Sequence, residues 1–107
     1  MTLAECCYRL TLKLPREEMH GLSSQIRRSA GSVAANIAEG YGRENLGSYI
    51  HHLRIAQGSL KELETHLILG ERVKFVGNDL VAPLLKRAEI AGKLLRALIR
   101  SLDGSQR

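Results

Sequence analysis

The stretch NLGSYIHHLRIAQGSLKELETHL, residues 45–67, decides the fold. Its apolar side chains recur at alternating steps of three and four, the heptad spacing that holds one face of a helix against its neighbours. That face consists of Leu46, Tyr49, Leu53, Ala56, Leu60, Leu63 and Leu67. We therefore predict a long amphipathic helix that begins near Asn45.

Helical stripes also lie on both sides of this stretch. The upstream stripe follows a turn through 16–21, runs to Gly40 and Gly42, and contains Leu22, Ile26, Ala30, Val33 and Ile37. The Val76-Gly77-Asn78 segment predicts a turn and an N-cap, and Pro83 lies near the helix start, where a missing amide donor costs least. The downstream stripe contains Leu84, Ala88, Ala91, Leu95, Leu98 and Leu102.

The chain begins with a shorter helix. Thr2 and Glu5 have the T-x-x-E spacing of a capping box, and Pro15 ends the helix after about three turns. Four amphipathic helices joined by short connections favour antiparallel neighbours. We predict an all-α, antiparallel up-down four-helix bundle with a short first helix, formed by one domain of residues 1–107 with a loose tail at 103–107.

Composition supports a helical bundle and argues against several other classes. Apolar residues make up 44% of the 107 residues and aromatic residues only 4%, so the core is aliphatic. No apolar run reaches the ~20 residues of a membrane span, and charges interrupt the first 14 residues. We therefore expect a cytoplasmic protein with no membrane association.

Chemistry-bearing residues show no catalytic or metal-binding pattern. The two cysteines, Cys6 and Cys7, are adjacent, so they form no disulfide framework, and the four histidines share no ligand spacing with them. Ser59 has no acid-base partner nearby in the sequence, and Gly58-Ser59 indicates a packing notch or a slight kink. We expect no cofactor, no metal, no small-molecule substrate and no enzymatic activity.

Charge gives the one functional signal that the residues carry by themselves. Lys and Arg number 16 against 11 acidic residues, a net charge of +5 that favours nucleic acid as a partner. Lys86, Lys93 and Arg100 recur every seven residues on the polar side of the last helix, and Arg96 lies beside them. Such a row is either a phosphate-contacting surface or only a solvated helix face.

The middle of the chain resembles a known family. The segments LSSQIRRSAGSVAANIAEGYGR (22–43) and IAQGSLKELETHL (55–67) are similar to the four-helix bundle proteins encoded within intervening sequences of 23S ribosomal RNA genes. The resemblance extends weakly into YRLTLKLPREE (8–18), and NIAEG (36–40) lies at the family's place relative to Gln25 and Arg28. Members resemble the accessory proteins of diversity-generating retroelements.

This resemblance implies a homopentamer that binds nucleic acid beside a reverse transcriptase. The chain departs from the family because members usually have a longer first helix, with an aromatic-containing segment before Tyr8. A short first helix would leave part of the groove between the other helices bare. Either the native start lies upstream of Met1, or a neighbouring subunit covers the gap.

Polar residues inside the family motif admit two interpretations. Asn36 and the i, i+4 pair of Glu39 with Arg43 fit helix termination and hydrogen bonding between helices. Alternatively, Arg27, Arg28 and Arg43 form one end of a phosphate-binding surface, because guanidinium groups match phosphate geometry.

Small residues crowd one region of the same helix, namely Ala30, Gly31, Ala34, Ala35 and Ala38. They indicate close approach of a helix, either from the same chain or from another subunit. Two functions therefore remain open at this point. The protein is a nucleic-acid-binding oligomer that acts as a ribosomal RNA or retroelement accessory factor, or it is a protein scaffold whose charge aids solubility.

Overall fold

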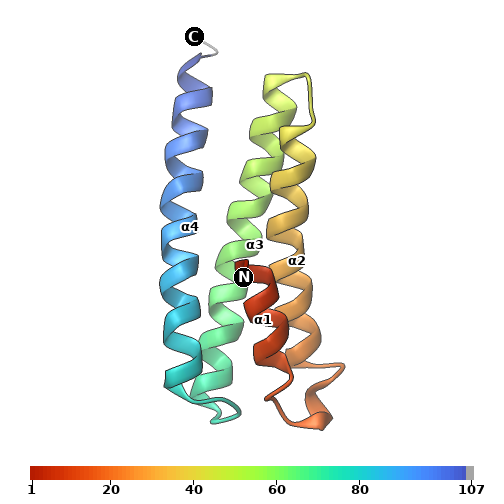
Figure 1. The fold of residues 1–107 in the computed structure, drawn as a ribbon. Coiled ribbons are helices and arrows are strands. Elements are labelled where there is room, and N and C mark those ends of the chain that lie inside the picture. Colours follow the sequence, from red (N-terminus) through yellow and green to blue (C-terminus); the bar gives the residue numbers. More distant parts are fainter. Residues whose placement is uncertain (106–107) are drawn as a thin grey trace.

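The helix boundaries of the computed structural model, which describes residues 1–105, follow the capping and periodicity signals of the sequence. Four α-helices and one short 3-10 turn make up these residues, and the helices run antiparallel to their chain neighbours (Figure 1). Their bounds are α1 Leu3–Thr11, η1 Arg16–Glu18, α2 Leu22–Tyr41, α3 Leu46–Arg72 and α4 Asn78–Ser105. The predicted all-α up-down bundle is confirmed.

Side-chain caps fix two of the helix starts. The Thr2 hydroxyl accepts a hydrogen bond from the Glu5 amide at 3.1 Å, and the Glu5 carboxylate accepts one from the Thr2 amide at 2.8 Å. The Thr2 backbone amide, and secondarily the Thr2 hydroxyl, favour the ionised Glu5 carboxylate and lower the pKa of Glu5. The Asn45 side chain accepts from the Ser48 amide at 2.9 Å and caps α3. The predicted capping box at Thr2 is confirmed. The predicted N-cap at Asn78 is wrong, because Asn78 is already the first residue of α4 and its side-chain amide donates to the Glu71 carboxylate at 3.2 Å.

Two chain segments differ slightly from expectation. α1 ends at Thr11, and the chain continues to Leu14 through i to i+3 hydrogen bonds that tighten the last turn before Pro15. At the other end, α4 extends to Ser105, so the first residues of the expected loose tail are helical. The remainder of that tail, 106–107, lies outside the described residues.

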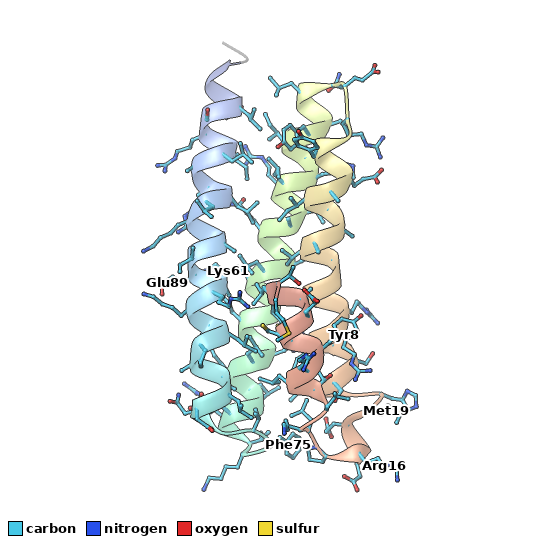
Figure 2. The ribbon with its side chains drawn as sticks, viewed as in Figure 1. Tyr8, Arg16, Met19, Lys61, Phe75 and Glu89 are labelled. Carbon is cyan, nitrogen blue, oxygen red and sulfur yellow. The ribbon has the colours of Figure 1, made fainter. Side chains whose placement is uncertain are left out.

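The buried core follows the heptad seam of α3. Side chains from all the helices extend into the space between them (Figure 2). Leu53, Leu63 and Leu67 are fully buried, and Leu60 is nearly so. The seam is confirmed from Leu53 onward. At its start, Leu46 and Tyr49 are only partly buried and Ile50 takes the core position. Other core side chains come from all the helices and include Cys7, Leu10, Ile26, Ala30, Val33, Val81, Leu84, Ala88, Leu95 and Ile99.

The short α1 leaves half of the bundle with three helices. α1 packs against α2 and α4 near one end, while α3 packs along both of its neighbours (Figure 1). Among the described residues, α2 and α4 do not pack directly against each other. Ile37 and Leu98 were predicted as core residues, but they are 38% and 37% exposed. The prediction is wrong there because no fourth helix lies between α2 and α4 at that level.

A series of side-chain hydrogen bonds, which we call the polar ladder, joins α2 to α3. Ser59 and Ser32 share a 2.7 Å hydrogen bond, and the Asn36 amide donates to the Ser32 carbonyl at 2.9 Å. His52 Nδ1 lies 3.1 Å from Asn36 Oδ1. Since the Asn36 oxygen accepts, the hydrogen bond requires the tautomer of His52 that carries a proton on Nδ1. Asn36 therefore bonds between helices, as its structural interpretation predicts.

Gly40 sits at the tightest point of this helix pair. A Cβ added there would lie 3.0 Å from both the Cβ of His52 and the Cδ1 of Tyr49. Gly31, on the same helix, would place a Cβ where no atom lies within 4 Å. Gly40 therefore serves the packing of α2 on α3, and Gly31 does not.

We expect Leu53→Asp to unfold the domain. Burying an unpaired carboxylate in place of a fully buried leucine should cost at least about 3 kcal/mol, a large part of the stability of a small domain. Thermal denaturation followed by circular dichroism measures the loss. Thr65→Asp, exposed on the same helix, is the control and should melt close to the parent. A Leu53→Asp variant as stable as its control would contradict the assigned seam.

The two glycines of α2 give a matched pair of alanine variants. Both substitutions gain helix propensity, up to about 1 kcal/mol, but only Gly40→Ala forces the helices apart, at about 1–3 kcal/mol. We expect Gly31→Ala to raise the free energy of unfolding and Gly40→Ala to lower it. Urea denaturation of both variants measures the difference. Equal stabilisation by both would show that the α2–α3 contact tolerates a methyl group.

Candidate nucleic-acid interface

The predicted row of cations lies on the solvent side of α4. Lys86, Lys93, Arg96 and Arg100 are all exposed. Their seven-residue spacing puts Lys86, Lys93 and Arg100 about 10 Å apart along the axis, opposite the buried face of Val81, Ala88 and Leu95. Lys93 Nζ lies 3.3 Å from the Glu89 carboxylate, an exposed pair that water largely screens. The row therefore presents its charge to solvent.

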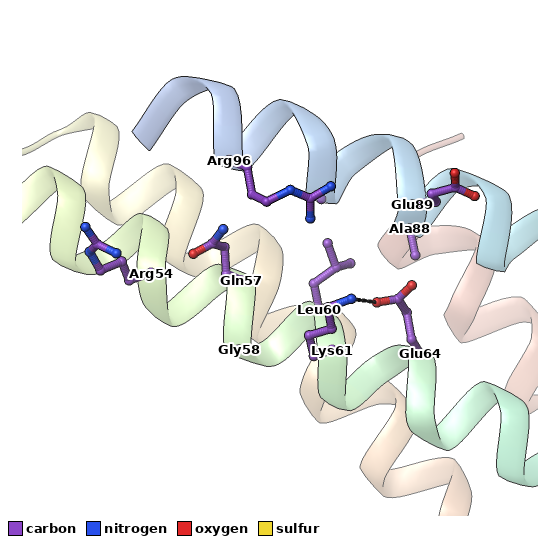
Figure 3. Close-up of a pocket in the computed structure, with 10 residues that line it drawn as sticks. Arg54, Gln57, Gly58, Leu60, Lys61, Glu64, Ala88, Glu89 and Arg96 are labelled. Atoms are coloured by element: carbon purple, nitrogen blue, oxygen red, sulfur yellow. Dashed lines mark ion pairs between the residues drawn. The ribbon is translucent and has the colours of Figure 1, made fainter. Parts of the chain in front are cut away.

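Arg96 and Arg100 also border a groove between α3 and α4, which we call the α3–α4 groove. It comprises a cavity of about 440 Å³ and an adjoining one of about 240 Å³ (Figure 3). Both cavities are lined by Arg54, Gln57 and Arg96. Lys61 lines the larger cavity and Arg100 the smaller.

No residue on the α3 side of this groove was predicted as a site residue from the sequence. Arg54, Gln57 and Lys61 are spaced three and four residues apart, so they form a polar row on one side of α3. The apolar heptad is the stronger pattern in the same helix and obscures this polar row. The signal was present, but only the packing of α4 on α3 places the row beside Arg96.

Arg27, Arg28 and Arg43 do not form the predicted cluster. Arg43 follows the end of α2, about 24 Å along the helix axis from Arg27 and Arg28. Arg27 donates from Nε to the Thr11 hydroxyl at 2.8 Å and lies over the Tyr8 ring, 5.3 Å from its centroid, so it fastens α1 to α2. Arg43 pairs with Glu39, as its structural interpretation predicts, and Arg28 is exposed by itself.

The two cysteines of α1 differ in burial, since Cys7 is buried and Cys6 is partly exposed. Burial, and secondarily the neighbouring Cys6, raise the pKa of the Cys7 thiol to about 12, so the thiol stays protonated and unreactive at neutral pH. Cys7 therefore packs in the core as a small apolar side chain. Within residues 1–105, no three His, Cys, Asp or Glu side chains gather in a metal-binding group.

Ser59 takes part in the polar ladder between α2 and α3. Its hydroxyl bonds to Ser32, and the imidazole of His52 is held by Asn36 two links away along the ladder. The ladder therefore joins two helices and gives Ser59 no direct contact with a base.

No helix in the described part of the chain has the length and apolar character needed to cross a bilayer.

A second surface is apolar and lies between α2 and α4, above α1. This apolar trough contains a cavity of about 230 Å³ lined by Ile37, Ala91, Leu94, Leu95 and Leu98. Leu94 is 66% exposed. Of the five small residues predicted to mark a close helix contact, Ala30 is buried and Gly31 is partly buried, while Ala34, Ala35 and Ala38 are exposed. Their interpretation as a contact with a helix of the same chain is therefore wrong beyond Ala30.

A family model and a solved structure are both similar to this chain. The model of the 23S rRNA-intervening sequence protein family matches residues 1–97. A crystal structure of a protein of unknown function from the S23 ribosomal protein family of Bacteroides thetaiotaomicron is similar, with a TM-score of 0.74 and 22% identity over 92% of this chain and 98% of that one. No curated protein matches the chain. At this identity, the solved structure supports the fold alone.

Proposed function

Since the chain belongs to the 23S rRNA-intervening sequence protein family, we propose that it is a non-enzymatic, oligomeric helical bundle that binds nucleic acid through phosphate contacts. The observation that carries the proposal is the exposed cation row on α4. Three of its charges follow one line and none of them is needed for the core. Phosphates attract such a surface without regard to base sequence.

The oligomeric part of the proposal rests on the apolar trough. Leu94, Leu98 and Ile37 form an apolar surface that one chain leaves in contact with water. Ala34, which is exposed one turn before Ile37 on the same side of α2, allows another helix to approach closely. A second copy of the chain is the partner that we propose. A ring of copies closes this kind of contact and also repeats the α4 row, which strengthens weak phosphate contacts through effective concentration.

The phosphate contact predicts a loss of salt dependence. We expect Lys86→Glu combined with Lys93→Glu to weaken binding to RNA and DNA, with the slope of log affinity against log salt falling by about 0.7–0.9 per lost contact. Fluorescence anisotropy with labelled oligonucleotides over a salt series measures it. Arg16→Glu with Lys74→Glu is the control, because it makes the same charge change at exposed sites away from α4.

The two outcomes against the proposal have different meanings. An unchanged slope in the Lys86 and Lys93 variant, with binding intact, would show that nucleic acid uses another surface. Absence of binding by the parent at low salt would leave the protein-scaffold alternative, in which the cation row is a solvated face.

Self-association is tested separately on the trough. We expect Leu94→Asp combined with Leu98→Asp to give a folded monomer, because Leu94 is mostly exposed in the single chain and the charges are buried only in the assembly. Light scattering after size exclusion gives the mass. Leu12→Asp, 75% exposed and distant from the trough, should leave the assembly unchanged. A parent that stays monomeric at tens of micromolar would refute self-association.

A further inference from the structure

The α3–α4 groove differs from the rest of the polar surface because it is hollow. Its position on the bundle is set by α3 and α4 along their shared length, and Gly58 and Gly92 are among its lining residues (Figure 3). Its combined cavities fall within the size range of small-ligand sites. The groove is thus large enough to enclose part of a ligand, whereas the cation row offers only surface contacts.

The floor of the larger cavity is apolar. Leu60 and Ala88 lie beneath it and are almost completely buried, so its accessible apolar surface comes from Gly58, Gly92 and the carbon stems of neighbouring side chains. A Cβ at Gly92 would lie 3.5 Å from Leu60 Cδ2 and 3.4 Å from Arg96 Nη1, at ordinary contact distance. A larger side chain at Gly92 would therefore fill the space between Leu60 and Arg96.

Free cationic donors stand above this floor. Arg96 extends from α4 into the gap, with its guanidinium near Leu60 (Figure 3). Among the described side chains, neither Arg96 nor Arg100 has a hydrogen bond or an ion pair. Arg54 is only weakly engaged, since its guanidinium lies 4.0 Å from the Asp103 carboxylate. These arginines offer hydrogen-bond donors in the fork geometry that suits phosphate.

The acidic residues of the groove each lie near a cation. Glu64 lies 3.5 Å from Lys61, Asp103 lies 4.0 Å from Arg54, and Glu89 lies 3.3 Å from Lys93 in an exposed, screened pair. Four cations and three carboxylates line the two cavities, so the excess charge is small and positive, and within residues 1–105 Arg96 and Arg100 are the cations of the groove without a carboxylate partner.

A ligand that matches the groove needs an anionic group beside a flat, weakly polar group. A nucleotide has both, because its phosphate suits the arginines and its base suits the apolar surface at Gly58 and Gly92. We infer that the α3–α4 groove binds one nucleotide unit, with the phosphate on Arg96 and Arg100 and the base over Gly92. A base reaches a recess between two packed helices only when it is unpaired, so the groove selects single strands over duplexes.

This inference deepens the proposed function and rests on it where the nucleotide belongs to a strand. The outer row of Lys86 and Lys93 contacts phosphates of duplex and single strand alike. The groove adds a contact that only an unpaired nucleotide makes. Blocking the groove should therefore change the preference between the two forms, while reversing the charge of the row should weaken both.

The test blocks the groove without changing its charge. In Gly92→Met a flexible side chain occupies the space over Leu60, and the change also favours the helix. We expect the affinity for a 12-nucleotide single strand to fall about tenfold or more, equivalent to about 1.4 kcal/mol, and the affinity for a 12-base-pair duplex to stay within about twofold. Gly104→Met on the same helix, where an added Cβ meets open space, is the control.

A second variant and a second probe separate the possible results. Arg96→Gln keeps the groove open but removes a donor, and it should lower single-strand affinity in the same direction. Thymidine 5′-monophosphate, titrated against isotope-labelled protein, should shift the amide resonances of Gly58 and Gly92 in the parent and leave the Gly58 resonance unshifted in Gly92→Met. A shift with the mononucleotide but no binding to strands would support the groove as a site for a free nucleotide while refuting the strand-binding function.

Unchanged single-strand affinity in both Gly92→Met and Arg96→Gln would overturn the inference and leave Arg96 as a cover over Leu60. An equal loss of duplex and single-strand affinity in Gly92→Met would overturn it as well. Binding carried entirely by Lys86 and Lys93 would leave the proposed function standing without the groove.

Discussion

The close packing of α2 on α3 is the constraint on which the rest of the molecule depends. The fully buried leucines of α3 supply its apolar part, and the absence of a side chain at Gly40 lets the backbones approach. The ladder from Ser59 through Ser32 and Asn36 to His52 fixes the relative position of the two helices. Partly buried polar contacts of this kind favour one alignment, since a shift would leave their groups unpaired. The family motif NIAEG thus has a structural role in this chain.

Given a fixed α2–α3 pair, the length of α1 divides the bundle into two different halves. Where α1 is present, Arg27 holds it to α2 through Thr11 and Tyr8, and four helices enclose the core. Beyond α1, only three helices remain, and the trough beside Leu94 and Leu98 is open. A closed core and an exposed apolar surface thus occur in one small domain. A further helix that packed on this exposed surface would remove its apolar side chains from water.

α4 carries different chemistry on each side of its buried stripe. Toward α2 it exposes the leucines of the trough, and toward α3 it places Arg96 and Gly92 over the groove. Its outer side carries Lys86 and Lys93. A helix can separate three surfaces in this way because residues three or four apart share a side, whereas their immediate neighbours point elsewhere. Self-association and nucleic-acid binding therefore need not compete for the same residues.

The sequence by itself determined the helices, because capping residues and apolar periodicity act locally. Thr2, Asn45 and the seam from Leu53 to Leu67 were all predictable in this way, and so was the cation row of α4. It did not determine which predicted core positions are covered, as Ile37 and Leu98 show, because that depends on how far a separate helix extends. Nor did it join Arg54 to Arg96 or separate Arg43 from Arg27, since those distances depend on helix pairing and on position along an axis. Only the tertiary structure, by packing α4 against α3, created a groove whose two sides are 42 residues apart in the chain at Arg54 and Arg96.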